Sequence, residues 1–455
     1  MSDAEGLMWR MEKDPSLSSN IGTVTILDRA PDFELFRERM LHASLHMPRL
    51  RQCVRVAPGN LAPPSWVRDS NFDIDHHVRR VALAKPADER ALYDLASVIT
   101  SDPFDRTRPL WQFTVVEGLK GNRAALIQKL HHTIADGESG VLLSLLYLDF
   151  ERDALPPPAP TPDEADEAAE AIDRDLETAD AVRDLLAGAL RVPLGVLGQV
   201  KDLLADPAQI PSATTAATNT VRGIATQLGD TDGARSPLWT QRSIRRRFET
   251  TSAPFTETRT AAKKLGGTLN TAFMTIATEA ASRYHVEFGE PVEALRSSMA
   301  ISTRTDDSGA NAFSLVRMLV PTGEMSIDER FRAIHEATDS AVRASSSASL
   351  DKLAALAALL PTSVVTRLAR QQAQTIDFAT SNVKGAPVPM FVAGAQLIAN
   401  YPLGPLSGVA FNLTLLSYLG RLDMGINIDA AAVAEPERLR QLVTDAVADF
   451  TALAD

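Results

Sequence analysis

The chain has little of what extracellular and membrane-spanning proteins usually contain. Cys53 is the single cysteine among 455 residues, which excludes an intrachain disulfide and favours a reducing cytoplasm. No apolar run approaches the roughly 18 residues that a membrane-spanning helix needs. The first residues are acidic, with no basic region followed by an apolar one, so the sequence predicts no secretory signal.

Aromatic residues are scarce, and acidic residues outnumber basic ones. Aromatic side chains make up 5% of the chain, and its formal net charge is −12. Nucleic-acid-binding surfaces need clustered cations, and single-strand binding also needs aromatic side chains on which bases stack. Composition therefore counts against a nucleic-acid partner.

Several catalytic and metal-binding signatures are also missing. The sequence has no Gly-x-Ser-x-Gly elbow, no glycine-rich phosphate loop and no Cys-x-x-Cys pair, which counts against a serine hydrolase. His42 and His46 stand four residues apart on a predicted helix, but Ala43 occupies the position of a zinc protease's glutamate and no third ligand is near in sequence. We therefore predict no metal site and no permanently bound cofactor.

What is present is a large hydrophobic fraction, 45% of 455 residues, enough for two or three domains. Strand and helix patterns alternate on both sides of an irregular middle, which begins with a proline-rich segment and an acidic, alanine-rich stretch. We predict an N-terminal half over 1–152, a connector over 153–240 and a C-terminal half over 241–455. Within the connector, Ala181 to Leu204 has a wide apolar face. This face would pack against the protein itself or lie on a lipid surface.

Hydrophobic periodicity, caps and breakers predict the individual elements. Predicted helices cover residues 32–46, 89–101, 140–150, 258–265, 268–284, 327–347, 350–372 and 436–453. Predicted strands cover residues 22–27, 51–56, 111–117, 124–127, 295–302, 314–320, 378–383, 391–399, 408–418 and 422–428. Leu419-Gly420 is predicted to turn the last two strands into a hairpin.

The most informative segment runs from Leu130 to Gly137 and reads Leu-His-His-Thr-Ile-Ala-Asp-Gly. It lies between a strand and a helix, where rigid elements present reactive side chains. A neutral imidazole accepts the proton of an attacking hydroxyl near pH 7. Because successive side chains of an extended segment point in opposite directions, one histidine should face a cavity, and we assign the base to His132. His131 would then shape the end of the strand.

Asp136 and Gly137 complete the segment. Asp136 would hold the local backbone or fix a cation, with Arg304 as a candidate partner, and Gly137 would let the chain enter the following helix tightly. The alternative is a pair of structural histidines at a strand end, such as His76-His77 elsewhere in the chain. The aspartate and glycine at their offsets favour the catalytic interpretation.

His131 to Gly137 matches the His-His-x-x-x-Asp-Gly motif of the CoA-dependent acyltransferase superfamily, which condensation domains of peptide synthetases share. The chain as a whole resembles bacterial wax ester synthase/acyl-CoA:diacylglycerol acyltransferases, in order and over nearly its full length. The segments that carry this closer resemblance are Met8 to Glu12, Phe72 to Val78, Arg108 to Trp111, Arg245 to Phe248, Leu269-Asn270, Ser381 to Val383 and Asn412 to Tyr418.

The resemblance implies an α/β fold of the α+β type. Two chloramphenicol-acetyltransferase-like halves, with mixed sheets and flanking helices, would meet around a solvent tunnel. It also places Asn270 close to the active site and offers Glu12 as a residue that orients the base. From its position alone, Asn270 would cap a helix.

Three further sites have two interpretations each. Pro109, Leu110 and Trp111 would line the substrate channel or form a rigid entry to a core strand. The hydroxyl of Ser417, like that of Thr414, would donate to the oxyanion of the reaction or satisfy a carbonyl within its sheet. The arginines at 245–247 would hold a phosphate-bearing cofactor or form a salt-bridged face.

The sequence also departs from the family pattern. Asn270-Thr271 stands where the family has Asn-Asp, and Lys384-Gly385-Ala386 where it has Pro-Gly-Pro. Near the N-terminus, Ser19-Asn20 replaces a common Met-His pair. These changes bear on substrate choice and on full activity.

We therefore predict an acyl-CoA-dependent O-acyltransferase that acylates diacylglycerol, and also long-chain alcohols, without a covalent enzyme intermediate. Acyl-CoA would be a co-substrate, and the protein would be cytoplasmic and peripherally associated with the inner membrane or lipid droplets. One alternative is a condensation-type acyltransferase with another acceptor, although no carrier-protein module is visible. The other is a catalytically weak lipid-binding protein of storage-lipid surfaces, which the altered motifs suggest.

Overall fold

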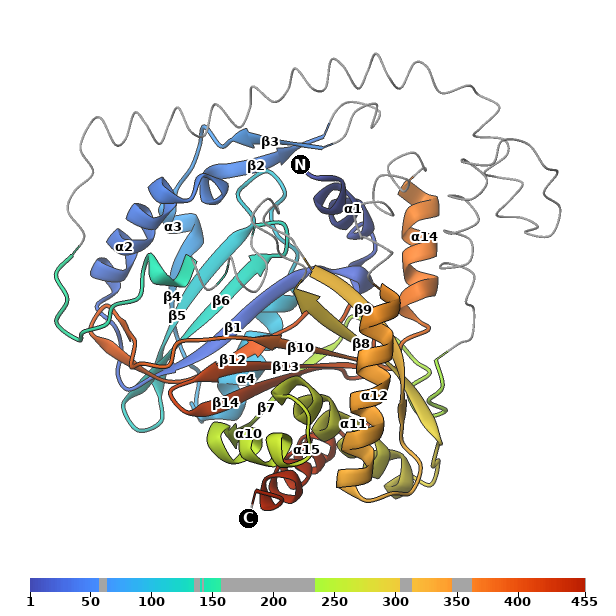
Figure 1. The fold of residues 1–455 in the computed structure, drawn as a ribbon. Coiled ribbons are helices and arrows are strands. Elements are labelled where there is room, and N and C mark those ends of the chain that lie inside the picture. The colour runs from blue at the N-terminus through green and yellow to red at the C-terminus, as the bar shows by residue number, and fades with distance from the viewer. Residues whose placement is uncertain are drawn as a thin grey trace, which may run out of the picture.

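The computed structural model describes residues 1–56, 64–134, 140, 143–156, 234–302, 313–345 and 362–454. These residues form two six-stranded sheets and a two-stranded ribbon, with helices packed around them (Figure 1). Both large sheets are mixed, because each contains parallel as well as antiparallel pairs. The predicted α+β architecture of two sheet-containing halves is confirmed. The apolar stretch Ala181 to Leu204 lies outside the described residues.

The first sheet has the strand order β11-β12-β1-β6-β5-β4. Its strands are β1 (Asn20–Leu27), β4 (Val78–Ala82), β5 (Trp111–Leu119), β6 (Arg123–His131), β11 (Phe391–Val392) and β12 (Ala395–Leu403). The elements around it are α1 (Asp3–Met11), η1 (Pro15–Leu17), α2 (Phe33–His46), η2 (Pro48–Arg51), α3 (Ile74–His77), α4 (Glu89–Ser101) and the ribbon of β2 (Gln52–Arg55) with β3 (Ser65–Arg68).

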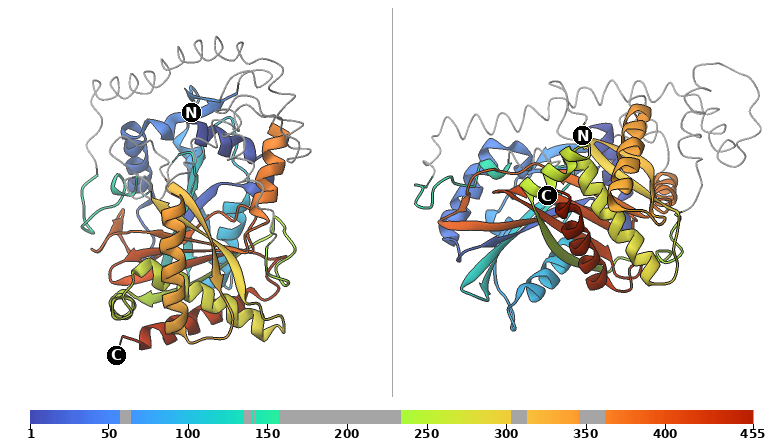
Figure 2. Two further views of the ribbon diagram at one scale, coloured as in Figure 1. Left: turned by 45° about the vertical axis from the view of Figure 1, so that its right-hand side comes forward. Right: turned by 60° about the horizontal axis from the view of Figure 1, so that its bottom comes forward.

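The second sheet has the order β7-β14-β13-β10-β8-β9. Its strands are β7 (Arg246–Pro254), β8 (Ala294–Ser302), β9 (Phe313–Pro321), β10 (Phe378–Val383), β13 (Phe411–Tyr418) and β14 (Arg421–Asp429). The helices of this half are α10 (Phe255–Lys264), α11 (Leu269–Glu287), α12 (Ile327–Ser345), α14 (Thr362–Ala373) and α15 (Pro436–Ala452). Figure 2 shows α14 beside α1 at one end of the molecule and the C-terminus at the other.

The two halves exchange strands. β11 and β12 come from the C-terminal part of the chain but belong to the first sheet, where β12 pairs antiparallel with β1. β12 also packs against β13 and β14 of the second sheet. At this crossing Gly425 lies so close to β12 that a Cβ atom would come within 1.8 Å of the Pro402 carbonyl oxygen. Only glycine permits this approach, which joins the sheets directly.

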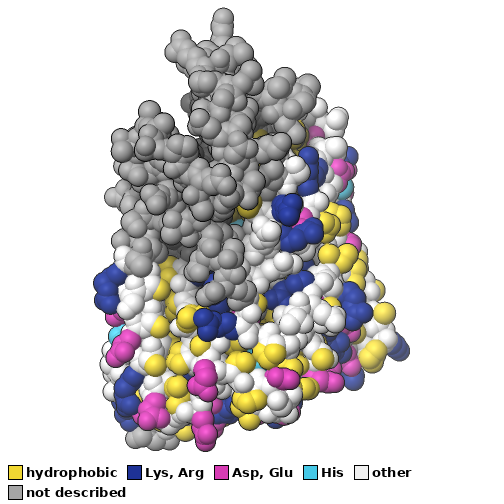
Figure 3. All heavy atoms as spheres, turned by 90° about the vertical axis from the view of Figure 1, so that its right-hand side faces the viewer, with side chains coloured by type: hydrophobic (Ala, Val, Ile, Leu, Met, Phe, Trp, Pro, Cys, Tyr) yellow, Lys and Arg dark blue, Asp and Glu magenta, His cyan; other side chains and the backbone are white. Residues whose placement is uncertain are grey.

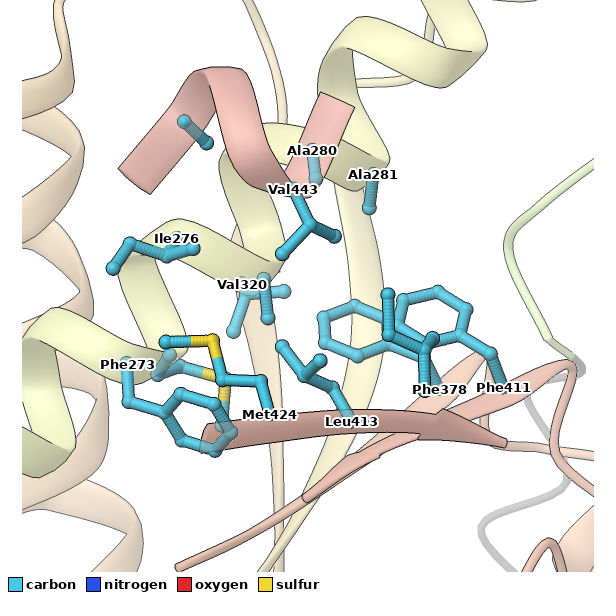
Figure 4. Packing of buried hydrophobic residues seen from close by; sticks show 14 of the residues in the cluster. Phe273, Ile276, Ala280, Ala281, Val320, Phe378, Phe411, Leu413, Met424 and Val443 are labelled. Atoms are coloured by element: carbon cyan, nitrogen blue, oxygen red, sulfur yellow. The ribbon is translucent and has the colours of Figure 1, made fainter. Parts of the chain in front are cut away.

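The core of the second half lies between its sheet and the helices α11 and α15. Figure 4 shows Phe273 and Ile276 of α11 above Met424 and Leu413 of the sheet, with Val443 of α15 closing the cluster. These side chains are at most 3% exposed. Each large one contributes about 1.5–3 kcal/mol through burial. The apolar residues that recur at helical spacing along α11 therefore form its buried face.

Most predicted boundaries are confirmed where a local signal sets them. The Asp32 side chain caps α2 by accepting from the Leu35 N–H, and Asp88 caps α4 in the same way. Leu419 and Gly420, with φ of 45° and 78°, turn the β13–β14 hairpin as predicted. Such left-handed turns match the twist of the paired strands.

Three predicted elements are wrong in part. Residues 140–150 do not continue as a helix, because Asp149 leaves it to exchange two 2.8 Å backbone hydrogen bonds with Phe391. The predicted strand 391–399 is broken into β11 and β12 by a turn at Ala393-Gly394, where φ is 43° and 84°. Asn270 does not cap α11, since the Thr268 hydroxyl accepts from the Thr271 N–H at 3.2 Å.

Candidate active site

The two histidines at the end of β6 have different surroundings. His131 is 1% exposed and faces the interior beside α1. His132, the next residue, is half-buried and lines a cavity between the two sheets. Successive side chains of a strand point to opposite faces of the sheet. Leu126, Gln128 and Leu130, which precede His132 at every second position, line the same cavity, and His131 therefore points away from it.

The hydrogen bonds of His131 fix its tautomer. Its Nδ1 accepts the Thr133 backbone N–H at 3.2 Å and lies 2.7 Å from the Thr133 hydroxyl. A backbone N–H only donates, so Nδ1 carries no proton and the neutral ring carries its proton on Nε2. Nε2 lies 2.9 Å from Glu12 Oε2. The direction of the Nε2–H bond departs from normal hydrogen-bond geometry, but the ring lies against the carboxylate. With Nδ1 accepting from Thr133 and Nε2 facing Glu12, neither ring nitrogen of His131 is available to the cavity.

Glu12 connects the histidine pair to α1. Its Oε1 accepts the Ser19 N–H at 2.6 Å, and the Ser19 carbonyl accepts the His132 N–H at 3.0 Å. Arg106 donates to Glu12 Oε2 at 3.3 Å and lies over the Trp9 ring. Burial alone would raise the pKa of Glu12, but His131, the Ser19 N–H and Arg106 together hold it below its ordinary value. Glu12 therefore stays ionised. Its carboxylate contacts His131 directly and positions the His132 backbone through Ser19.

The cavity that His132 lines has a volume of about 360 Å³. Strands β1, β6 and β12 of the first sheet form one wall, and β10 and β13 of the second sheet form the other. Most of its lining is apolar, including Ile21, Val383 and Leu416, with a few polar side chains among them. Its volume falls in the usual range of ligand sites, about 300–1,000 Å³. A hydroxyl-bearing apolar chain could bind here with its polar end at His132.

Two of the predicted sites lie elsewhere. Leu110 and Trp111 are each 1% exposed in the core of the first half and do not line the cavity, and neither does Pro109. Trp111 stacks on His77 with 4.4 Å between ring centroids and donates its indole N–H to the Leu50 carbonyl at 2.8 Å. The geometry supports the interpretation of this segment as an entry to a core strand.

Asn270 and Ser417 also lie outside the cavity lining. Asn270 is exposed and accepts a hydrogen bond from the Asn382 amide. The Ser417 hydroxyl accepts the Gly385 N–H at 3.1 Å, and this bond positions Gly385, which does line the cavity. Ser417 therefore supports a residue of the cavity wall, whereas Asn270 contacts Asn382, which does not line the cavity.

The altered family positions have structural explanations. Ser19 acts through its backbone, which its side chain does not affect. Thr271 is 1% exposed, and its hydroxyl lies 3.0 Å from that of the capping Thr268. Lys384 is exposed, while Gly385 and Ala386 beside it line the cavity. Of these altered residues, Ala386 lines the cavity that His132 also lines.

Asp136, Gly137 and Arg304 lie outside the described residues. Sequence reasoning missed Arg106, which the fold brings to Glu12 from 94 residues away. The triple arginine is largely salt-bridged, since Arg247 pairs with Glu249 and Glu437 at 2.7 Å each. His42 is half-buried and His46 is exposed, with 3.1 Å between their Nε2 atoms. Within the part of the chain that the structure describes, no group of three or more potential ligands could hold a metal ion.

Lys and Arg side chains are scattered over the described part of the face shown in Figure 3. Three of the chain's basic residues line a groove next to Glu12, which we call the basic groove. Lys13, Arg367 and Arg370 line it together with hydroxyl-bearing residues of α14, and its volume is about 420 Å³. Arg370 pairs with Asp14. No carboxylate among the described residues forms an ion pair with Lys13 or Arg367. Lys13 directly follows Glu12, so the groove begins next to the residue that contacts His131.

Comparison with known proteins explains this arrangement. The model of the wax ester synthase/diacylglycerol acyltransferase catalytic domain matches residues 1–273, and that of the WS/DGAT C-terminal domain matches residues 309–450. The chain belongs to the wax ester synthase/diacylglycerol acyltransferase family. It is therefore an acyltransferase by family, as the His-His-x-x-x-Asp-Gly motif predicted.

Relatives and solved structures agree with this family. A Mycobacterium tuberculosis H37Rv protein named as a diacylglycerol O-acyltransferase is 32% identical over 98% of this chain and 91% of its own length. A second protein of that strain, with the same enzyme name, is 27% identical over 99% and 95%. The wax ester synthase/diacylglycerol acyltransferase of Marinobacter aquaeolei has the same fold, with a TM-score of 0.67 and 21% identity over 99% of this chain and 98% of its own.

The first condensation domain of the CDA synthetase is a more distant neighbour. It has a TM-score of 0.57 at 12% identity and covers all of this chain and 95% of its own. At this identity the likeness concerns the fold alone. This chain and its two structural neighbours therefore share the fold.

Proposed function

We propose that this member of the WS/DGAT family transfers the acyl group of an acyl-CoA to the hydroxyl of diacylglycerol or a long-chain alcohol, with His132 as the general base. The observation that carries the assignment is the division between the two histidines. His132 lines the apolar cavity, whereas both ring nitrogens of His131 are held by Thr133 and Glu12.

The reaction needs one proton-transfer group at the end of an apolar site. His132 accepts the proton of the acceptor hydroxyl as the oxygen attacks the thioester carbonyl. The tetrahedral intermediate then collapses, the carbon–sulfur bond breaks, and His132 returns the proton to the departing thiolate. The two sheets hold both substrates in one cavity, so positioning supplies much of the rate.

Glu12 and His131 are positioning residues in this scheme. Glu12 fixes the backbone of Ser19, and Ser19 fixes the backbone of His132. His131 fills the space between β6 and α1 and gives the Glu12 carboxylate a hydrogen-bond donor. The base thereby keeps one orientation toward the cavity without contacting the carboxylate itself.

The basic groove fits the nucleotide end of the acyl donor. CoA carries its phosphates at the end remote from the thioester, and clustered Lys and Arg side chains bind phosphate oxygens. In a chain of net charge −12, Lys13, Arg367 and Arg370 form a local positive site beside Glu12. The donor would place its phosphates in the groove and its thioester near His132.

The donor and acceptor assignments are tested together. Purified protein is incubated with labelled palmitoyl-CoA or palmitoyl-pantetheine, which lacks the nucleotide, and with diacylglycerol, hexadecanol or a small alcohol. We expect transfer to diacylglycerol or hexadecanol. The Lys13→Glu, Arg367→Glu double variant should raise the KM for palmitoyl-CoA about tenfold, because repulsion replaces charge-assisted bonds. Its KM for palmitoyl-pantetheine should stay unchanged.

The matched control is Arg259→Glu with Lys264→Glu on α10, which changes the net charge equally on exposed residues remote from α14. No transfer to any acceptor by the wild type would refute the proposed function. Equal KM increases for both donors, or in both double variants, would refute only the placement of the phosphates.

Contact with a lipid surface is part of the proposal, because the substrates are too apolar to dissolve freely. Among the described residues no helix has the length and apolarity to cross a bilayer. The cavity, however, has exposed apolar residues at its rim: Leu145 is 49% exposed, Phe150 65% and Val388 41%. We place the peripheral contact with membranes or lipid droplets at this rim, where a lipid could enter directly.

Vesicle flotation tests the rim. The Leu145→Ser, Phe150→Ser double variant should lose most of its binding to phosphatidylcholine vesicles that contain diacylglycerol, since two exposed apolar anchors are removed. Val98→Ser with Val286→Ser, which removes two exposed valines elsewhere, should float like the wild type. Unchanged flotation of the rim variant would move the contact to another surface.

The lipid-binding alternative was based on the altered Asn270-Thr271 and Lys384-Gly385-Ala386 segments. Thr271 and Lys384 do not line the cavity, whereas Ala386 does, so the turnover measured in the acceptor panel decides between this alternative and an active transferase. A condensation-type reaction with another acceptor is covered by the acceptor panel above.

A further inference from the structure

A group of polar side chains interrupts the apolar wall of the cavity. Thr23 of β1 lies directly opposite Gln128 of β6 in the antiparallel register, and both side chains line the cavity. Tyr147, from the segment that follows the histidine motif, lines it beside them. We call these three residues the polar belt. The proposed reaction at His132 does not use them.

Two hydroxyls of the polar belt are buried with unused hydrogen-bonding capacity. Among the described residues, the Thr23 hydroxyl has no hydrogen-bond partner, and the contact between the Tyr147 hydroxyl and the Gln128 side chain falls short of normal hydrogen-bond geometry. Other hydroxyls of the cavity are satisfied: Thr25 donates to Asn400 and Thr414 donates to Asn412, each at 2.9 Å. Buried polar groups are nearly always paired, so unpaired ones in a cavity indicate a ligand or an ordered water.

The Tyr147 hydroxyl cannot leave the cavity for solvent. The residue is 1% exposed, and its ring makes edge contacts with Phe36 and Phe113, with centroid distances of 6.0 Å and 5.5 Å. Burial raises the pKa of this hydroxyl, and the neighbouring Gln128 opposes the rise only in part. The hydroxyl therefore remains protonated and is available as a donor.

Strand geometry gives the distance of the polar belt from the base. Gln128 and His132 are four residues apart and line the same cavity. An extended strand rises by about 3.3 Å per residue, so they are separated by about 13 Å. With carbon–carbon bonds of about 1.5 Å in zigzag, this span corresponds to about ten methylene groups. Leu130 and Ile21, which face each other between the two positions, are apolar.

We propose, on the basis of the function proposed above, that the polar belt binds a hydroxyl group carried about ten carbons from the reacting end of a long acyl chain. A hydroxyl both donates and accepts, as this site requires. Tyr147 and Thr23 would donate to its oxygen, and the Gln128 amide oxygen would accept its proton. The enzyme would thus select mid-chain hydroxylated acyl groups over unsubstituted ones.

The test compares three donors of nearly equal size: octadecanoyl-CoA, 10-hydroxyoctadecanoyl-CoA and 2-hydroxyoctadecanoyl-CoA. The wild type should have a kcat/KM about three- to tenfold higher for the 10-hydroxy donor than for the other two, as expected for one buried hydrogen-bonded group. The Thr23→Val, Tyr147→Phe double variant should lose this preference. Tyr93→Phe, which removes the hydroxyl of a buried tyrosine outside the cavity, should keep it.

Three results would overturn the proposal. They are equal use of the three donors by the wild type, a preference that survives in the double variant, and a best rate with decanoyl-CoA and no gain from the 10-hydroxyl. The last would show that ordered water closes the apolar cavity at the polar belt. Displacement of a fluorescent fatty acid by octadecanoic and 10-hydroxyoctadecanoic acids measures the same preference without turnover. A binding preference in a protein without transferase activity would support the polar belt and refute the proposed function.

Discussion

Replacement of His132 by alanine is expected to lower kcat for acyl transfer by about a hundred- to ten-thousand-fold, the usual contribution of a general base. The melting temperature should change little, because the side chain is only half-buried at the wall of a cavity. Radiolabelled acyl transfer and thermal unfolding measure the two effects. Near wild-type turnover by His132→Ala with a confirmed acceptor would refute the mechanism.

His131→Ala should give the opposite pattern. Its ring is 1% exposed and contacts Thr133 and Glu12, so its removal leaves a space and an under-satisfied carboxylate. We expect a loss of about 1–3 kcal/mol in the free energy of unfolding. The loss of kcat should be milder than for His132→Ala. His46→Ala, at the exposed end of α2, is the control that should change neither quantity.

The second large effect is expected for Glu12. Glu12→Gln removes the charge that accepts from Ser19, His131 and Arg106. We expect the free energy of unfolding to fall by about 2 kcal/mol at pH 7, since hydrogen bonds to a charged group are lost. We also expect kcat to fall about tenfold with little change in KM, because the His132 backbone loosens while the cavity persists.

The stability difference between wild type and Glu12→Gln should depend on pH in one direction. The folded state lowers the pKa of Glu12 below its ordinary value of 4.5, so the unfolded chain takes up the proton first as the pH falls. The stabilisation is complete above pH 4.5 and disappears as the pH falls through the folded pKa. Denaturant unfolding at several pH values measures it. A difference that is constant down to pH 3 would show that the carboxylate charge is not the stabilising feature.

Glu287→Gln is the control for this series. Glu287 forms an exposed pair with Arg438, and such pairs contribute little to stability. The control should change neither kcat nor the free energy of unfolding by more than a small fraction of the Glu12 effect.

Capping residues and hydrophobic periodicity predicted those helices and strands whose ends are set by residues close in sequence. The helix from Glu89 to Ser101 was predicted to the residue, because Asp88 caps it and its apolar face is periodic. Residues 140–150 were predicted wrongly for the converse reason. Asp149 pairs there with Phe391, and it also forms a buried 2.9 Å ion pair with Arg39. A sequence pattern within residues 140–150 cannot predict pairing with partners that lie more than a hundred residues away in the chain.

The family resemblance implied the α+β class. The residues by themselves determined the histidine pair at a strand end, the alternation that turns the two rings in opposite directions and the division into two halves around an irregular middle. These depend on periodicity and on residue chemistry within a few positions. The resemblance offered Glu12 as the residue that orients the base, and the tertiary structure decided how it does so, through His131 and Ser19, and that Arg106 joins Glu12. The tertiary structure also decided that the cavity wall combines β1 and β6 with β12, a strand supplied by the other end of the chain. Packing between distant segments determines these features, because each such contact depends on the shape of both partners.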